Sequence, residues 1–140
     1  MVTSIDPTRL KLTSEHGSEG VLLGTRCREC GACSFGPAIL CQRCTSSSLE
    51  SVELTSRGVL YSYTLVHVPP AGWPGPVPYV LGQVELDDGP HVLAEVVDCR
   101  WEDLKVGMAM VLALQTVTMP DSDEQKAVYK WRVDSGEAPT

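Results

Sequence analysis

Two Cys-x-x-Cys pairs, separated by ten residues, constrain this chain more than any other feature of its sequence. The first pair is Cys27 and Cys30, and the second is Cys41 and Cys44. A Cys-x-x-Cys turn places two sulfurs on one edge of a tetrahedron, and Zn²⁺ prefers four thiolates at tetrahedral corners. The segment between the pairs is long enough for one small hairpin that turns near Gly36-Pro37. We therefore predict that these four cysteines bind one zinc ion.

The predicted zinc site is structural rather than catalytic. Four thiolates close the coordination shell and leave no position for water or substrate. The segment 21–48 is too short to bury a stable core of its own, so metal binding would supply its folding free energy. Gly31 follows the first pair directly, where a tight turn with positive φ favours glycine.

Redox chemistry and disulfides are the alternative roles for these cysteines. The first twenty residues carry charged side chains and no apolar block, so we expect no secretory signal and a cytoplasmic, reducing compartment. Stable disulfides are not expected there, which favours zinc. Cys33 could replace Cys30 as a ligand, but the simpler geometry of the pairs makes Cys33 a small apolar residue.

Length and charge narrow the class of protein. The chain has 140 residues, of which 43% are hydrophobic, enough for one compact domain or two very small ones. Its formal net charge of -7 argues against a general nucleic-acid binder. It has no apolar run of the roughly 18 residues that a membrane-spanning helix needs.

We expect an N-terminal arm (1–20) with a short helix near Thr8–Ser14, a zinc ribbon (21–48), an OB-fold domain (49–134) and a flexible tail (135–140). One helical turn is expected at Trp101–Leu104, with Asp98 as its cap. A turn at Ser56-Arg57-Gly58 would join the first two strands of the OB-fold domain. Runs rich in β-branched and aromatic residues, bounded by turn residues, predict six strands: Leu49–Thr55, Val59–Val68, Tyr79–Leu86, His91–Asp98, Met108–Met119 and Ala127–Val133.

The expected fold class is therefore mostly β, with the ribbon followed by a five- to six-stranded OB-fold barrel. A small β-sandwich is the alternative, because the number of strands does not fix whether a sheet closes.

The sequence does not predict a catalytic set. None of the three histidines (His16, His67 and His91) has a sequence neighbour that suggests a catalytic partner, and there is no Gly-rich phosphate loop. Cys99 lies in an acidic segment, and negative surroundings raise a thiol pKa, so we expect Cys99 to be structural. We expect no catalytic residues in this chain.

Two features could contact a partner or a ligand. Arg26, Arg28 and Arg43 form a basic patch on the ribbon, which could meet phosphate or balance the negative charge of a four-thiolate zinc site. The proline-rich loop 69–78 presents Trp73, which could anchor an interface or pack on its own barrel. The candidates for contact with a partner or CoA are Arg26, Arg28, Phe35, Arg43, His67, Trp73 and Tyr79.

The order of these features resembles a known two-domain family. The resemblance covers about residues 20–118 and rests on an ordered series of segments rather than on the ribbon alone. The segments are Leu22-Leu23-Gly24-Thr25-Arg26-Cys27-x-x-Cys30-Gly31, Phe35-x-Pro37, Cys41-x-x-Cys44, Gly58-Val59-Leu60-Tyr61-Ser62-Tyr63-Thr64, Pro78-Tyr79-Val80, Leu93-Ala94-Glu95-Val96-Val97-Asp98-Cys99 and Val106-Gly107-Met108. Members of this family join a rubredoxin-like zinc ribbon to an OB fold and accompany thiolase-like acyl-CoA enzymes.

The resemblance implies a non-catalytic accessory subunit in a hetero-oligomer. Its partner would be a thiolase-like catalytic subunit (a thiolase, acyltransferase or retro-aldolase), with a CoA ester at or near the shared interface. Two departures weaken parts of the match: Ala38 stands where the family often has a basic residue, and residues 1–20 contain no aromatic side chain. The alternatives are a free-standing acyl-CoA binder and, less favoured by the acidic barrel segment, a single-stranded nucleic-acid module.

Overall fold

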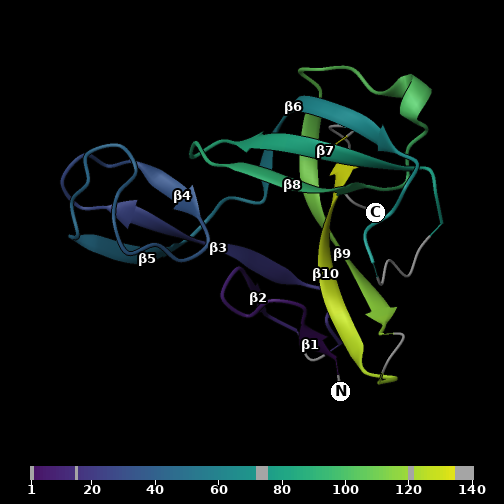
Figure 1. Cartoon of the computed structure of the whole chain (residues 1–140), viewed down its shortest axis with the longest axis horizontal. Helices are drawn as coiled ribbons and strands as arrows, with labels where there is room; N and C mark the ends of the chain where they lie inside the picture. Colours follow the sequence, from purple (N-terminus) through teal and green to yellow (C-terminus); the bar gives the residue numbers. More distant parts are fainter. Residues whose placement is uncertain (1, 15, 72–75, 120–121, 135–140) are drawn as a thin grey trace.

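The computed structural model describes residues 2–14, 16–71, 76–119 and 122–134, and its strands form two sheets (Figure 1). Trp73 and the expected tail 135–140 lie outside the described residues. Within the described residues, no helix is long or apolar enough to cross a lipid bilayer.

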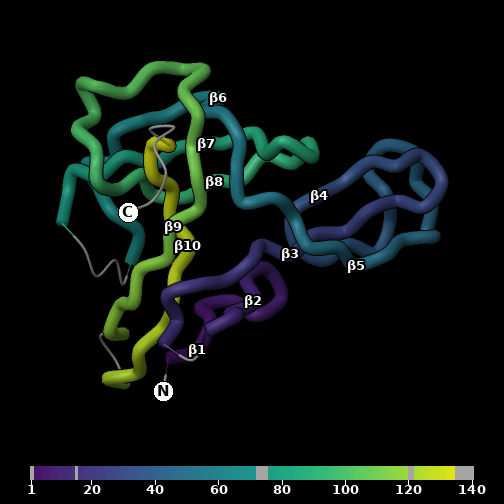
Figure 2. Tube along the Cα trace, turned by 180° about the vertical axis from the view of Figure 1, so that it is seen from behind, coloured from purple at the N-terminus to yellow at the C-terminus, as the bar shows by residue number. Residues whose placement is uncertain are grey.

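The smaller sheet is organised around one long strand, β3 (Gly20–Cys27). The first half of β3 pairs with β2 (Leu10–Leu12), and its second half pairs with β4 (Cys33–Phe35) and with β5 (Leu49–Glu53). Seen from behind, the chain runs along β3 into the ribbon and returns through β5 to the barrel (Figure 2). Strand β3 therefore links Cys27, the first cysteine of the predicted metal site, with the N-terminal strand β2.

The larger sheet closes on itself. Its strands are β6 (Arg57–Val66), β7 (Tyr79–Leu86), β8 (His91–Val96), β9 (Ala109–Thr118) and β10 (Gln125–Val133). They follow the order β6-β7-β8-β10-β9, and β9 returns to pair with β6. Only β8 and β10 run parallel within this ring. This order and closure confirm the predicted OB-fold barrel.

The barrel is filled by residues that alternate along its strands. In β7 and β8 every second side chain is buried, as expected for strands with one face on a core. Trp131 is fully buried, and its indole Nε1 donates a hydrogen bond of 3.2 Å to the Val92 carbonyl. The buried barrel residues are Leu60, Val80, Val84, Leu86, Val92, Ala94, Val96, Leu104, Met110 and Trp131.

The expected helix near Thr8–Ser14 is wrong, because this segment contains strand β2 instead. Leu10 is fully buried in the common core, which fixes the segment as the partner of β3. The turn before β2 is held by Asp6, whose carboxylate accepts hydrogen bonds from Thr8 and Arg9. These contacts lower the pKa of Asp6, and the Thr8 hydroxyl contributes most. The expected arm is thus tied to both sheets, since β1 (Thr3–Ser4) pairs in parallel with β10.

Two further expectations need correction. Leu49–Glu53 does not form a hairpin with β6, because it pairs with β3 in the ribbon sheet and leads to the buried Leu54. The expected helical turn is present as the 3₁₀ helix η1 (Trp101–Asp103), but its cap is not Asp98. Arg100 stands at the N-cap without a side-chain hydrogen bond, while Asp98 has a φ of 60° in the preceding turn.

Candidate metal centre and contact surfaces

The four cysteines of the two pairs come together at the end of the ribbon. All four sulfurs lie within 4.8 Å of one another. The Cys27 and Cys44 sulfurs are 3.5 Å apart, as are those of Cys30 and Cys41, so each contact joins one pair to the other. Cys33 does not belong to this group.

Each pair forms the same kind of turn. The Gly31 N–H donates to the Cys27 carbonyl at 3.0 Å, and the Thr45 N–H donates to the Cys41 carbonyl at 2.8 Å. Gly31 has a φ of 78°, as predicted, and Thr45 has a φ of 63° at the equivalent position of the second turn. A β-branched residue in this region is an outlier, so the second turn carries backbone strain that the first avoids.

Backbone N–H groups point at the sulfurs. The amides of Cys44 and Arg43 each lie 3.4 Å from the Cys41 sulfur, and together they lower the pKa of Cys41 to about 6. The Cys30 amide lies 3.5 Å from the Cys27 sulfur and likewise lowers the pKa of Cys27. These donors favour the thiolate form that a metal requires.

The donor set fits a metal ion. Four sulfurs from two turns surround one point, and four thiolates this close together need a cation to offset their mutual repulsion. All four positions would be filled by protein ligands, which is typical of a structural site. Soft thiolate donors suit zinc and iron.

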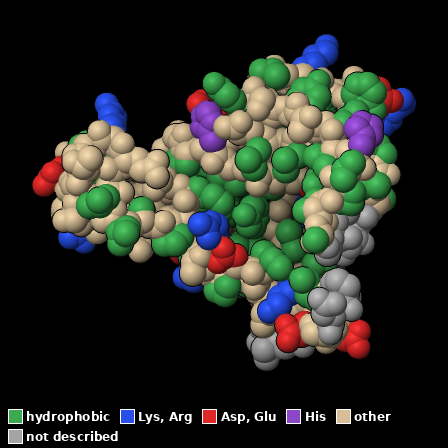
Figure 3. Space-filling model, viewed as in Figure 1, with side chains coloured by type: hydrophobic (Ala, Val, Ile, Leu, Met, Phe, Trp, Pro, Cys, Tyr) green, Lys and Arg blue, Asp and Glu red, His purple; other side chains and the backbone are tan. Residues whose placement is uncertain are grey.

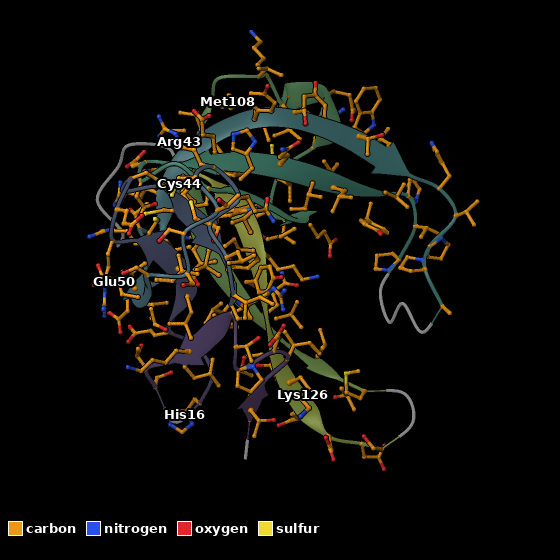
Figure 4. The ribbon with its side chains drawn as sticks, turned by 60° about the vertical axis from the view of Figure 1, so that its left-hand side comes forward. His16, Arg43, Cys44, Glu50, Met108 and Lys126 are labelled. Atoms are coloured by element: carbon orange, nitrogen blue, oxygen red, sulfur yellow. The ribbon has the colours of Figure 1, made fainter. Side chains whose placement is uncertain are left out.

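The basic patch on the ribbon contains a carboxylate that the sequence analysis missed. Glu50 lies opposite Arg26 in the β3–β5 ladder. Its oxygens are 4.0 Å from the Arg26 guanidinium and 3.6 Å from Arg28 Nε. Arg43, at the end of the ribbon beside Cys44 (Figure 4), lines a cavity of about 270 Å³ that Cys33 also borders. Two of the three arginines thus have an anionic neighbour within the ribbon, which no local sequence signal revealed.

Phe35 joins the ribbon to the barrel. Its ring packs edge-to-face on Tyr129 of β10, with 5.6 Å between ring centroids. The Arg9 guanidinium lies 5.9 Å from the centroid of the same ring. Phe35 is therefore partly buried by the chain's own residues, and no local pattern indicates these partners because they lie on distant segments.

The remaining candidates lie on the barrel. His67 is exposed just after β6, and Tyr79 begins β7, where it borders a hollow of about 250 Å³ between β8 and β10. Trp73 lies outside the described residues. The six candidates that the structure describes are divided between the ribbon and the barrel and do not form one site.

The described residues contain no arrangement of a nucleophile with a general base. His91 contacts Gln83 at 2.7 Å and Glu85 at 2.9 Å, and its ring packs against that of Tyr61 with centroids 4.6 Å apart and the planes tilted by 52°. Burial, together with Asp103, raises the pKa of Cys99, so this thiol stays protonated near neutral pH. The direction agrees with the expectation from its acidic surroundings.

Fold and site together define a class of proteins in which a four-cysteine ribbon is attached to an OB-fold barrel. Residues 51–115 match the family described as the C-terminal OB-fold domain of ChsH2. A DUF35 domain-containing scaffold protein of Methanocaldococcus jannaschii is 30% identical over 112 residues, which cover 79% of each chain. This chain belongs to the DUF35 family, as the resemblance of its ordered motifs indicated.

Two other relatives are named as parts of enzymes. The benzoylsuccinyl-CoA thiolase subunit BbsA of Geobacter metallireducens is 30% identical over 95 residues, covering 68% of this chain and 62% of that protein. Among solved structures, the Ltp2-ChsH2(DUF35) aldolase superposes with a TM-score of 0.61 at 28% identity. The match covers 81% of this chain and 84% of that one.

Proposed function

We propose that this chain is a non-catalytic accessory subunit that assembles with a thiolase-like acyl-CoA enzyme. The observation that carries the proposal is its similarity to chains named as a scaffold protein, a thiolase subunit and part of an aldolase. The catalytic chemistry would then belong to the partner, and the two would form a cytoplasmic hetero-oligomer.

The ribbon's metal in this proposal is one zinc ion bound by Cys27, Cys30, Cys41 and Cys44. The close approach of the four sulfurs and the N–H groups aimed at Cys27 and Cys41 support it. Zinc has no redox chemistry, and its filled d shell imposes no coordination geometry of its own. It therefore suits a closed tetrahedral site that holds two turns together. Elemental analysis of the purified chain should find one zinc per chain, and iron or no metal would contradict this part.

A CoA ester would lie at or near the shared interface. Among the arginines, Arg43 suits a phosphate best, because Arg26 and Arg28 share the carboxylate of Glu50. The 270 Å³ cavity beside Arg43 is smaller than the sites of about 300–1,000 Å³ that enclose whole ligands, so the partner would supply the remaining wall.

Co-expression with a thiolase-like subunit encoded beside this chain tests the proposal. The two chains should co-purify at fixed stoichiometry, and the partner's activity with CoA esters should fall when this chain is omitted. Full activity of the partner alone, with no complex formed, would refute the accessory role.

Titrations of the isolated chain separate the alternatives. Tight binding of CoA esters without a partner would favour a free-standing acyl-CoA binder. Salt-dependent binding of a single-stranded oligonucleotide would favour a nucleic-acid module. The accessory role predicts neither.

A further inference from the structure

The barrel has an opening where two of its strands separate. In the described part of the chain, β8 and β10 pair only at Val96 and Trp131. From this point the two strands diverge toward their N-terminal ends (Figure 1). β1 covers β10 only at Lys126 and Ala127, so β10 has no strand partner on this side between those two ladders. Among the described residues, a stretch of strand edge is therefore left open on each side of the gap.

The hydrogen-bond pattern shows which backbone groups of β8 face the opening. The Leu86 N–H donates to the Pro90 carbonyl, and the β7–β8 register then places Val92 and Ala94 in hydrogen-bonded pairs with β7. The N–H and C=O of Leu93 must point the opposite way, into the opening. Val97 lies four residues after Leu93, so its N–H points to the same side of the strand. The Val97 N–H donates to the Trp131 carbonyl of β10, which confirms that this side faces β10 and the opening.

A hollow of about 250 Å³ lies in the same opening and is mainly apolar. Hydrophobic side chains surround the hollowed region between the barrel and the N-terminal strands (Figure 3). Two of the side chains that line it are unusually exposed for their type, Leu93 at 57% and Ile5 at 38%. Tyr79, Leu81, Val128 and Tyr129 also line it and are half-buried.

The charged groups in the hollow already satisfy each other. Lys130, which is buried, donates to the carboxylate of Glu95 through a direct ion pair. The hollow therefore offers no net charge to an ionic ligand. Its volume lies below the range of about 300–1,000 Å³ typical of small-molecule sites, and it suits an apolar side chain.

We propose that the free edge of β8 at Leu93 binds an extended, uncharged segment of the catalytic partner by strand addition. The segment's main chain pairs with the Leu93 N–H and C=O, and one of its apolar side chains enters the hollow. Exposed strand edges combined with a side-chain pocket are the two parts of this binding mode. This inference rests on the proposed function, because it takes the thiolase-like subunit as the occupant.

Amide hydrogen exchange and one edge variant test it on the co-purified complex. The Leu93 amide should exchange more slowly in the complex than in the isolated chain. Leu93→Pro removes the N–H that faces the opening, together with the leucine side chain, and leaves the ladder with β7 intact because Leu93 donates no hydrogen bond to β7. It should weaken binding of the partner by about tenfold or more. Leu93→Ala keeps the N–H and is the matched control, expected to bind more tightly than Leu93→Pro. Circular dichroism and thermal unfolding should show that both variants are folded.

The outcomes distinguish this inference from the proposed function. A wild-type complex in which Leu93 exchange is unchanged and Leu93→Pro binds as tightly as Leu93→Ala overturns the docking mode but leaves the accessory role intact. Failure of wild-type chain to bind the partner overturns both. Slowed exchange at Leu93 in the isolated chain that grows with its concentration identifies a second copy as the occupant and also overturns the proposal. If Leu93→Pro is unfolded, the exchange measurement on wild-type chain decides.

Discussion

The two cysteine turns provide a matched pair of substitutions, because Gly31 and Thr45 occupy equivalent positions with φ of 78° and 63°. A Cβ added at Gly31 would meet no heavy atom within 4 Å, so the cost of Gly31→Ala is conformational rather than steric. Holding an L-residue in the left-handed region costs roughly 1–2 kcal/mol. Alanine also restricts the unfolded chain more than glycine does, which offsets about 0.4–1 kcal/mol of this cost. Gly31→Ala should therefore destabilise the folded ribbon by about 1 kcal/mol.

Thr45→Gly is the reverse experiment. It stabilises the turn by relieving the same backbone strain. Two smaller effects oppose this: the exposed hydrogen bond from the Thr45 hydroxyl to the Cys44 carbonyl is lost, and glycine makes the unfolded chain more flexible. We expect a net stabilisation of about 0.5–1 kcal/mol.

Metal affinity is the sensitive assay, because folding of the ribbon and metal binding are coupled. Competition with a chromophoric chelator at fixed pH should show about fivefold weaker binding for Gly31→Ala and about two- to fivefold tighter binding for Thr45→Gly. Wild-type metal affinity in Gly31→Ala, or weaker metal binding in Thr45→Gly, would show that the left-handed conformation at these positions costs nothing.

Three further predictions concern the barrel and the metal centre. Gly58→Ala would place a Cβ 2.2 Å from the Glu85 carbonyl oxygen, so denaturant unfolding should show a loss of about 1–3 kcal/mol or more, and unchanged stability would contradict the close approach. Burial raises the pKa of Tyr129 in the folded chain. The stability that the neutral phenol contributes is therefore complete below the unfolded pKa of about 10, and it is lost as the pH rises from that value through the raised pKa of the folded state. Tyr129→Phe should accordingly flatten the loss of thermal stability measured between about pH 9 and pH 11, relative to wild type. Cys41→Ser should abolish stoichiometric metal binding while Cys33→Ser retains it, and equal loss in both variants would show that the ligand set is wrong.

The parts of the fold that follow from short-range patterns were predicted well. The predicted strands Tyr79–Leu86 and His91–Asp98 flank the turn residues Asp-Asp-Gly-Pro, and the structure pairs them as the β7–β8 hairpin. The positive φ of Gly31 also follows from its place directly after a Cys-x-x-Cys pair. In each case the residues that determine the geometry are neighbours in the sequence, so local propensity and tertiary structure agree.

The errors concern segments whose partners are distant. Residues 8–14 have no strong helix or strand pattern, and β2 forms only because β3 offers an edge and the core accepts Leu10. The segment Leu49–Glu53 has the pattern of a strand, but the pattern cannot say which sheet it joins. Pairing with β3 brings Glu50 beside Arg26 and Arg28, and so changes the charge of a surface that appeared basic in the sequence.

By itself, the sequence determined the four cysteines that can hold a metal, the strand-rich composition of the barrel and the family to which the chain belongs. The physical reason is that ligand spacing, side-chain alternation and turn residues act over a few positions. Only the tertiary structure decided that Phe35 packs on Tyr129, and that β8 parts from β10 to leave a strand edge over an apolar hollow. Both depend on where a closed, twisted sheet brings distant backbone segments together, and no local pattern specifies that position.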